Sequence, residues 1–316
     1  MAGTITHAFF AEDIAKKINF NDKYINNLKT FSQGHDMYFF LIKKRKNGKK
    51  IGNYFHQNKT KDFFINMINY IKENNLFYND EILSYLYGYI NHYVLDKNIH
   101  PFVRYKTGVF KKKDKATYKY NSKHADMENY IDAYLIYKRK NILPGKFRSN
   151  VFCLKPYKFS KELKKLIDYT FKKTYDFDNA SKKYEFAIHK ACFEYGLLRT
   201  DRLGLKRKIY GFIDKFTSAK AYKFKPISFA YKIGEFDNLL NKENKTWNHP
   251  MDKNEKYNYS FFDIYNNSLN EAEVIIKKVN DYFNNKKVDL NKIFDNTSFS
   301  TGKDCLDKRK EQYFEW

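Results

Sequence analysis

Two His-x-x-x-carboxylate pairs lie close together in the first half of the chain. His92 and Asp96 form the first pair, His124 and Glu128 form the second, and His100, followed by a proline, lies between them. On a helix, residues at positions i and i+4 share one face about 6 Å apart, so each pair can close on a single ion. Neutral imidazole nitrogen and carboxylate oxygen are ligands that zinc accepts in open catalytic sites. The spacing therefore predicts a metal centre.

Three further ligand candidates precede these pairs. His7 opens the first helical pattern, Asp36 comes just before an apolar stretch, and His56 precedes a helical pattern at 61–74. A single histidine is more commonly a hydrogen-bonding partner, but burying this many ionisable groups together without a metal would be costly. His35, beside Asp36, is either a supporting partner or the ligand in its place, and we favour Asp36 as the ligand.

Four other residues have less defined expected roles. Arg104 and Lys106 follow the His-Pro dipeptide and either offer positive charge to an anion or lie in a solvated loop. His189 lies in a helical pattern among aromatic residues and is interpreted as a packing histidine. His249 is a candidate for the border of a pocket.

The elements that must position these residues are predicted to be helices. Apolar residues recur at three- and four-residue spacing in several stretches. We expect Pro101 to end the helix that carries His92 near His100, because the residue before a proline is disfavoured in the α region. The basic run 43–50 either contacts phosphate or forms a solvated loop between helices, and we favour the loop. The predicted helices cover 61–74, 80–96, a segment capped by Ser160, 179–196, 205–217 and 259–284, and less regular stretches cover 43–53, 104–120, 141–159 and 241–258.

This array of amphipathic segments, with few glycines and prolines, predicts an all-α fold. We expect residues 1–316 to form a single multi-helix domain, with the ligand-bearing part at 1–130 and a helical continuation at 131–316. No internal repeat and no linker composition divides the chain.

Composition restricts the remaining possibilities. The chain has 316 residues, 42% of them hydrophobic, and its 60 basic and 36 acidic residues give a net charge of +24. Such a charge attracts phosphate esters, nucleic acid or acidic lipid headgroups. Three widely spaced cysteines predict neither a disulfide framework nor a Cys-x-x-Cys metal pair. Because the start lacks a signal-peptide pattern and no apolar run reaches about 18 residues, we expect a cytoplasmic protein without a transmembrane segment.

The order of the candidate ligands resembles that of the zinc-dependent phospholipase C family, an all-helical phosphodiesterase fold shared with single-strand-specific zinc nucleases. The most specific part of the resemblance is His-x-x-x-Asp, then His-Pro, then His-x-x-x-Glu. It implies that one zinc is held by Asp36, His56, His92 and Asp96, and a second by His100, His124 and Glu128.

The resemblance also implies a third zinc, bound by His7 and bridged by Asp96, so that two to three ions are expected. In the family, that ion also takes the amino group and carbonyl of an N-terminal tryptophan, which this sequence lacks near its start. The amine of Met1 or of a trimmed Ala2 would have to replace it. The spacing from Asp96 to His100 is also shorter than the usual family spacing.

By this resemblance the expected function is zinc-dependent hydrolysis of a phosphodiester, with a phospholipid headgroup ester as the substrate and contact with a membrane surface. Zinc ions close together neutralise the charge of a phosphodiester and lower the pKa of bound water. Asp36 is the candidate general base that orients or deprotonates the attacking water. Two alternatives remain open: a single-strand nuclease of the same fold, and a non-catalytic, zinc-stabilised protein that binds anions or membranes.

Overall fold

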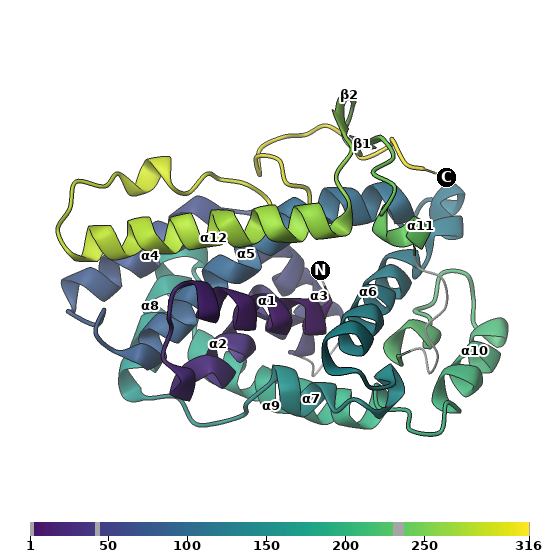
Figure 1. Ribbon diagram of the computed structural model, residues 1–316, viewed down its shortest axis with the longest axis horizontal. Helices are drawn as coiled ribbons and strands as arrows, with labels where there is room; N and C mark the ends of the chain where they lie inside the picture. The colour runs from purple at the N-terminus through teal and green to yellow at the C-terminus, as the bar shows by residue number, and fades with distance from the viewer. Residues whose placement is uncertain (1–2, 42–44, 230–236, 316) are drawn as a thin grey trace.

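The computed structural model describes residues 3–41, 45–229 and 237–315. Within these ranges the protein has the predicted all-α fold, with one small antiparallel sheet (Figure 1). The α-helices are α1 (Thr4–Lys17), α2 (Ile25–Phe31), α3 (Arg45–Gln57), α4 (Thr60–Glu73), α5 (Asp80–Thr107), α6 (Lys123–Lys140), α7 (Ser149–Cys153), α8 (Lys161–Tyr175), α9 (Ala180–Leu198), α10 (Lys206–Phe216), α11 (Asp237–Leu240) and α12 (Phe261–Phe283). The strands are β1 (Trp247–His249) and β2 (Asp252–Tyr257), and the 3-10 helices are η1 (Asp22–Tyr24), η2 (Gly34–Phe40), η3 (Lys115–Tyr120), η4 (Pro144–Lys146), η5 (Lys225–Ile227) and η6 (Leu290–Lys292).

Side-chain caps define where several of these helices begin. The predicted cap Ser160 accepts a hydrogen bond from Leu163 N at the start of α8. At the start of α12, Ser260 and Asp263 form a reciprocal capping box. Each cap satisfies backbone N–H groups that have no partner within the helix. The helices predicted at 61–74, 179–196, 205–217 and 259–284 correspond to α4, α9, α10 and α12.

Helix α5 is the central element of the fold, and most of its 28 residues are buried. The prediction that it ends near His100 is wrong, because Pro101 lies inside the helix and α5 continues to Thr107. A proline removes one backbone hydrogen bond and crowds the preceding turn. The next residues, Phe102 and Val103, are completely buried, so packing of the final turns outweighs that local cost.

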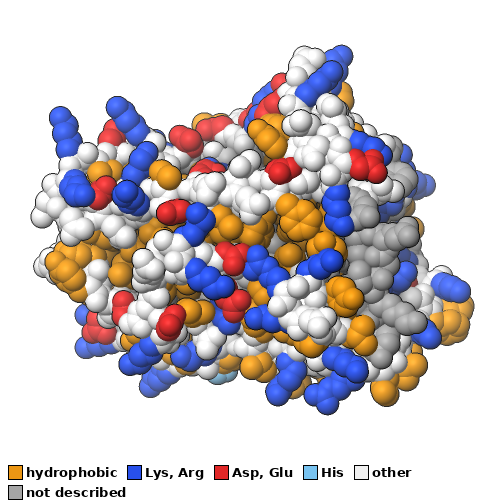
Figure 2. All heavy atoms as spheres, viewed as in Figure 1, with side chains coloured by type: hydrophobic (Ala, Val, Ile, Leu, Met, Phe, Trp, Pro, Cys, Tyr) orange, Lys and Arg blue, Asp and Glu red, His pale blue; other side chains and the backbone are white. Residues whose placement is uncertain are grey.

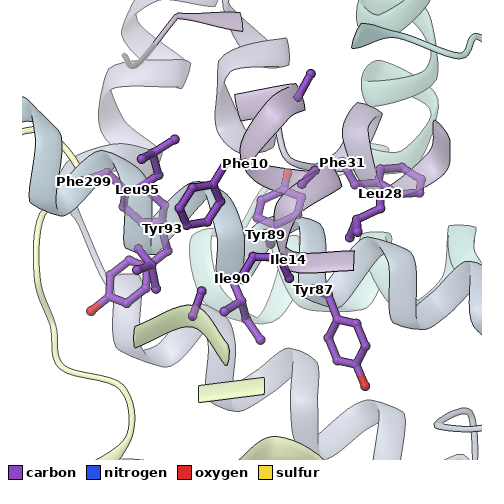
Figure 3. Close-up of a cluster of buried hydrophobic side chains, with 14 of the residues drawn as sticks. Phe10, Ile14, Leu28, Phe31, Tyr87, Tyr89, Ile90, Tyr93, Leu95 and Phe299 are labelled. Atoms are coloured by element: carbon purple, nitrogen blue, oxygen red, sulfur yellow. The ribbon is translucent and has the colours of Figure 1, made fainter. Parts of the chain in front are cut away.

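The hydrophobic core forms around α5. Figure 3 shows side chains of α1 and α2 packed against those of α5, with Phe10, Phe31 and Tyr89 among them. These three side chains are almost completely removed from solvent. On the opposite side α12 lies along α5 (Figure 1). The helix that carries three of the candidate ligands is therefore held on several sides by packed apolar side chains.

Two regions differ from the sequence expectations. The basic run 43–50 was predicted to be a loop, but from Arg45 onward it belongs to helix α3, while residues 42–44 lie outside the described residues. The helical continuation is also interrupted. The β1–β2 hairpin occupies part of the stretch 241–258, and beyond α12 the described chain contains only the short helix η6. That C-terminal tail packs back onto the core through the buried residue Phe299.

The surface carries basic side chains in many places. Figure 2 shows Lys and Arg side chains scattered over the visible face, as expected from the net charge of +24. Among the helices formed by the described residues, none combines the length and the apolar character needed to span a bilayer.

Candidate metal centre

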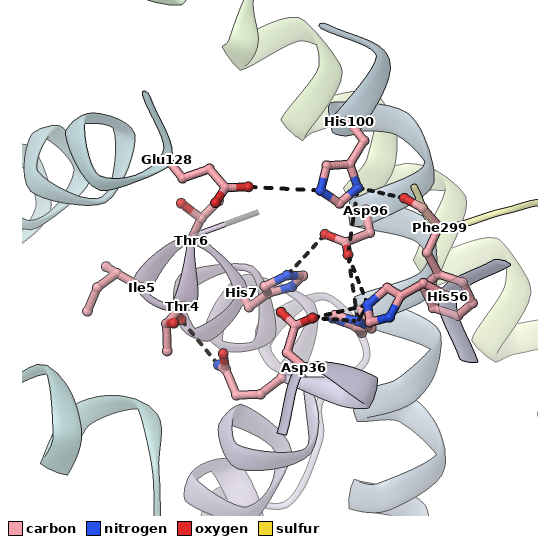
Figure 4. Close-up of polar contacts among 12 residues, drawn as sticks. Thr4, Ile5, Thr6, His7, Asp36, His56, Asp96, His100, Glu128 and Phe299 are labelled. Carbon is pink, nitrogen blue, oxygen red and sulfur yellow. Dashed lines mark hydrogen bonds and ion pairs between the residues drawn. The ribbon is translucent and has the colours of Figure 1, made fainter. Parts of the chain in front are cut away.

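The eight candidate ligands come from five elements that meet beside the middle of α5. His92, Asp96 and His100 follow one another at four-residue spacing on α5 and so lie along one face of that helix. The remaining candidates are His7 on α1, Asp36 on η2, His56 on α3, and His124 and Glu128 on α6. Figure 4 shows the labelled members of this group pointing toward one another.

The structure brings four of these residues into one cluster, the first cluster, formed by Asp36, His56, His92 and Asp96. Asp36 Oδ1 lies 3.0 Å from His56 Nε2 and 3.9 Å from His92 Nε2. The Nε2 atoms of the two histidines are 3.3 Å apart. Asp96 Oδ2 lies 3.6 Å from His92 Nε2 and 3.9 Å from His56 Nε2. All four side chains are almost completely buried.

These distances fit a zinc ion. Zinc binds nitrogen and oxygen ligands at about 2.0–2.2 Å, which places neighbouring corners of a tetrahedron about 3.3–3.6 Å apart. The five measured separations of the first cluster run from 3.0 to 3.9 Å and bracket that range. Four buried donor atoms of the types that zinc prefers therefore already lie near the corners of one coordination polyhedron.

The backbone of α3 sets the orientation of His56. The Nδ1–H of His56 donates to the carbonyl oxygen of Gly52, at 2.7 Å, so the lone pair of Nε2 faces the cluster. Gly52 also lets α3 approach η2, because a Cβ atom there would lie 2.9 Å from Phe39 Cζ. The close approach of α3 to η2 places His56 beside Asp36.

A second glycine makes room for His92. Gly34, at the start of η2, has a positive φ of 48°, and a Cβ atom there would come within 2.9 Å of His92 Cβ and closer still to its ring atoms. Its carbonyl oxygen accepts a hydrogen bond of 3.1 Å from the hydroxyl of Tyr184. The absence of a side chain at this position lets the ring of His92 lie directly against the turn that carries Asp36.

The second cluster consists of His100, His124 and Glu128, whose ligand atoms lie within 4.8 Å of one another. Glu128 Oε1 is 2.8 Å from His124 Nε2 and 3.9 Å from His100 Nε2. Within the described part of the chain, His100 Nε2 is buried and has no hydrogen-bond partner. Leaving such an atom unsatisfied is costly, and a metal ion would use its lone pair. A set of two imidazoles and one carboxylate leaves a fourth zinc position open.

The C-terminal tail supports both clusters. His100 Nδ1–H donates to the carbonyl oxygen of Phe299, at 2.6 Å, which directs its Nε2 toward Glu128. Phe299 N and Ser298 Oγ both donate to the carbonyl oxygen of His56, at 2.9 and 3.3 Å. Backbone partners of this kind orient metal-binding histidines. The sequence interpretation placed all ligand-bearing residues within 1–130 and did not include these supporting groups. Every residue has a backbone carbonyl group, so the sequence does not reveal which of them orients a histidine.

His7 adjoins the first cluster, with its ring centroid 4.6 Å from that of His92, and it faces the other oxygen of Asp96. Its Nε2 is 3.2 Å from Asp96 Oδ1, whereas Oδ2 of the same carboxylate faces His56 and His92. Asp96 thus presents one oxygen to each side, which is the arrangement that a bridging carboxylate requires. The expected amine ligand from Met1 or Ala2 lies outside the described residues.

Asp132 on α6 fixes the turn of α1 that carries His7. Its carboxylate accepts hydrogen bonds from Ile5 N at 3.1 Å, Thr6 N at 2.9 Å and Thr6 Oγ1 at 2.7 Å. The N–H groups of Ile5 and Thr6 are backbone donors that a helix start leaves without partners. Burial raises the pKa of Asp132 to about 6.

The electrostatics of five cluster residues favour their metal-binding protonation states. Burial lowers the pKa values of His92, His100 and His124, so these imidazoles are neutral at pH 7. Burial alone would raise the pKa of Glu128, but the neighbouring positive groups together, with His124 foremost, outweigh burial and bring that pKa down to about 2. For Asp96, the surrounding histidines likewise outweigh burial and hold the pKa well below its usual range. Neutral imidazole and ionised carboxylate are the forms that coordinate zinc.

His35 does not join either cluster. Its ring is buried among aromatic rings, including Phe63 and Tyr89 at centroid distances of 4.9 and 5.1 Å. Neither ring nitrogen has a hydrogen-bond partner among the described residues. Of the two neighbouring candidates, the structure thus brings Asp36 rather than His35 to the other ligands.

The four remaining candidates are not members of either cluster. His189 is exposed on α9, so its interpretation as a packing histidine is wrong. His249 is buried in β1, where Nε2 donates to Thr301 O at 2.9 Å. The expectation that Arg104 and Lys106 lie in a loop is also wrong, because both are on α5. Arg104 forms an ion pair with Glu311 at 2.5 Å, and Lys106 forms one with Glu315 at 2.6 Å. The two side chains that were expected to attract an anion are therefore paired with carboxylates of the C-terminal tail.

The fold and the two clusters define a helical protein built to hold metal ions between buried histidines and carboxylates. A family model described as zinc dependent phospholipase C matches residues 6–196, which is more than half of the chain. The chain therefore belongs to the zinc-dependent phospholipase C family, as the order of its ligands predicted. No curated protein and no solved structure matches the chain.

Proposed function

We propose that this protein hydrolyses the headgroup phosphodiester of a phospholipid, with two or three zinc ions held by the residues described above. Family membership supports a zinc-dependent, phospholipase C-like hydrolase. The observation that carries the proposal is the convergence of seven buried or half-buried ligand groups into two adjoining clusters, with His92, Asp96 and His100 on one face of α5.

Each residue has a defined part in this proposal. Asp36, His56, His92 and Asp96 would hold one zinc, and His100, His124 and Glu128 a second. His7, with Asp96 as the bridge, would contribute to a third. Bound zinc supplies positive charge to the phosphodiester oxygens and lowers the pKa of water. The carbonyl oxygens of Gly52 and Phe299 keep two of the imidazoles in the tautomer that presents Nε2 to the ligand side.

Asp36 is the proposed general base. Its Oδ1 belongs to the first cluster, and the second oxygen of the carboxylate would orient the attacking water and accept its proton. Burial raises the pKa of Asp36, which makes its carboxylate a stronger base than an exposed one. The reaction would consume one water and break the bond between phosphorus and the glycerol oxygen, with the proton passing to the leaving oxygen.

The test is hydrolysis by the purified, zinc-loaded protein. A chromogenic phosphocholine ester and a phospholipid dispersed in detergent should both be cleaved, and single-stranded DNA or RNA should not. A matched pair of variants locates the activity. His92→Ala should abolish hydrolysis, whereas His189→Ala, which removes an exposed histidine, should leave it unchanged. Cleavage of single-stranded nucleic acid without cleavage of the esters would assign the nuclease alternative, and turnover of neither substrate class would contradict the proposal.

A further inference from the structure

Helix α10 is amphipathic, and its apolar face is turned toward solvent. Ile209, Phe212, Ile213 and Phe216 recur at three- and four-residue spacing, and their side chains are 55%, 62%, 40% and 77% exposed. No residue of α10 is buried. A surface helix of a soluble protein ordinarily points such a stripe toward the core. This helix has the opposite orientation, which requires an explanation.

The polar side of α10 faces the protein and holds the helix in this orientation. Arg207 donates to Asp126 Oδ1 at 3.2 Å and to Tyr130 Oη at 3.1 Å, both on α6. Asp214, seven residues further along the same face, accepts hydrogen bonds of 2.8 Å from the backbone N–H groups of Phe224 and Lys225. Because directed hydrogen bonds fix the polar face inward, the exposed position of the apolar face is determined by the fold.

The start of α10 extends the apolar stripe and fixes it further. Leu203 and Leu205 are 79% and 50% exposed. Asp201 accepts hydrogen bonds from Leu205 N at 2.9 Å and Arg207 N at 3.1 Å, which satisfies N–H groups at the beginning of the helix. We call the apolar residues Leu203, Leu205, Ile209, Phe212, Ile213 and Phe216 the α10 surface.

Basic residues surround the α10 surface. The segment 202–225 contains eight Lys and Arg residues and one acidic residue, Asp214. Lys208 and Lys215 are exposed and, at 100° per residue, lie together along one edge of the apolar stripe. A hollow of about 650 Å³ adjoins the start of α10, and its lining includes Arg148 and Arg202. Figure 2 shows hydrophobic and basic side chains next to one another at the lower right, where α10 lies in Figure 1.

The α10 surface is coupled to the helix that carries the second cluster. Asp126, the partner of Arg207, lies on α6 between His124 and Glu128. Asn121, just before α6, donates to the carbonyl oxygens of Ala219 and Ala221, at 2.7 and 2.9 Å. The segment that follows α10 is therefore tied to the chain beside the second cluster, and a large ligand held by α10 would lie close to the metal-binding region.

We infer that the α10 surface binds an anionic lipid bilayer. An apolar stripe with exposed lysines along its edge matches the boundary between acyl chains and headgroups, where the apolar side chains insert and the lysines reach the phosphates. Acidic headgroups add an attraction that grows with each basic residue near the surface. The role of this binding, which is to bring phospholipid to the zinc clusters, rests on the proposed function. The binding itself is measured without hydrolysis.

The test is sedimentation of the full-length protein with vesicles of equal parts phosphatidylglycerol and phosphatidylcholine. The wild type should bind these vesicles more tightly than vesicles of phosphatidylcholine alone. Phe212→Ser with Phe216→Ser should raise the dissociation constant by about tenfold or more, because two aromatic side chains no longer enter the apolar phase. Tyr78→Ser with Leu306→Ser removes two exposed apolar side chains elsewhere and should leave binding unchanged.

A charge-reversal pair provides an independent measurement. Lys208→Glu with Lys215→Glu should weaken vesicle binding and reduce its dependence on salt, whereas Lys277→Glu with Lys278→Glu on the exposed side of α12 should weaken it much less. Circular dichroism spectra should show that all variants are folded. Hydrolysis of a soluble chromogenic ester should be the same in the wild type and in the Phe212/Phe216 variant.

Three results would overturn the inference: no binding of the wild type to anionic vesicles, equal binding by the Phe212/Phe216 variant, or a wild-type dimer that this variant abolishes in the absence of any vesicle binding. Vesicle binding that depends on the α10 surface, in a protein that hydrolyses no ester, would support the inference while contradicting the proposed function. Hydrolysis of the soluble ester without vesicle binding would support the proposed function and contradict the inference.

Discussion

Replacing Gly34 with alanine should remove zinc from the first cluster by displacing His92. A Cβ atom at position 34 would lie 2.9 Å from His92 Cβ and nearer to the ring, whereas carbon atoms in contact prefer about 3.5–4.0 Å. His92 must therefore retreat by roughly 0.6–1.1 Å or more. Metal–ligand distances tolerate only about 0.2 Å, so the displaced Nε2 can no longer share an ion with His56 and the two carboxylates. Zinc affinity at the first cluster should fall by more than about 100-fold, which exceeds the usual effect of losing an orienting partner.

Gly34→Ala also introduces backbone strain, and a matched variant separates this from the effect on the metal. A residue with a side chain in the left-handed region costs about 1–2 kcal/mol. Gly108, at the end of α5, has a positive φ of 66°, and a Cβ there would lie 2.6 Å from Tyr120 Cγ. The ψ of Gly108 is −179°, a backbone region that is almost confined to glycine. Gly108→Ala therefore imposes at least as much backbone strain and a similar collision with a ring, at a site that holds no candidate ligand.

Zinc affinity is measured by calorimetric titration of each metal-free variant with zinc. Stability is measured separately, by urea unfolding without metal. In the metal-free state Gly34→Ala should lose roughly 2–5 kcal/mol of stability, and Gly108→Ala at least as much. Only Gly34→Ala should lose the affinity of the first cluster. The reasoning is refuted if Gly34→Ala binds zinc like the wild type, or if Gly108→Ala loses zinc to the same extent.

Three further predictions concern metal and pH. His92→Ala should lower the bound zinc by at least one ion per chain, measured by elemental analysis, whereas exposed His189→Ala should not; equal losses would contradict the assignment. Removing zinc with a chelator should lower the Tm by several degrees in calorimetry, and added zinc should restore it, because an ion at 100 times its Kd stabilises the native state by about 2.7 kcal/mol. Because burial raises the pKa of Asp132 to about 6, its contribution to stability should fall as the pH rises from about 4 through 6. Relative to Asp132→Asn, which does not titrate, the wild type should lose roughly 2–3 kcal/mol of unfolding free energy over that range, and a flat difference would contradict the raised pKa.

The helices and the ligand groups could be predicted because both leave periodic marks in the sequence. Apolar spacing predicted the helices, and the two His-x-x-x-carboxylate pairs predicted which side chains share a helix face. The structure brings seven of the eight candidates into two clusters and leaves His7 beside Asp96. The zinc-binding roles of these residues, the catalytic role of Asp36 and the single-domain organisation of residues 1–316 stay predictions.

The features that could not be predicted depend on tertiary contacts. Pro101 lies inside α5 because the residues after it are buried, which a local rule on proline does not include. The carbonyl oxygen of Phe299, which orients His100, lies 199 residues away in the sequence. It belongs to the backbone, so no residue type identifies it. The periodicity of α10 predicts an amphipathic helix, but the same pattern describes a stripe that faces the core and one that faces solvent. Only the inward hydrogen bonds of Arg207 and Asp214 distinguish the two.

The most direct test of the metal centre is an anomalous-diffraction measurement at the zinc edge on crystals of the purified protein. We predict one zinc peak among Asp36, His56, His92 and Asp96, and a second among His100, His124 and Glu128, with the ligand atoms at about 2.0–2.2 Å from each ion. A protein that binds no zinc under saturating conditions, or that binds it only at other residues, would contradict the account.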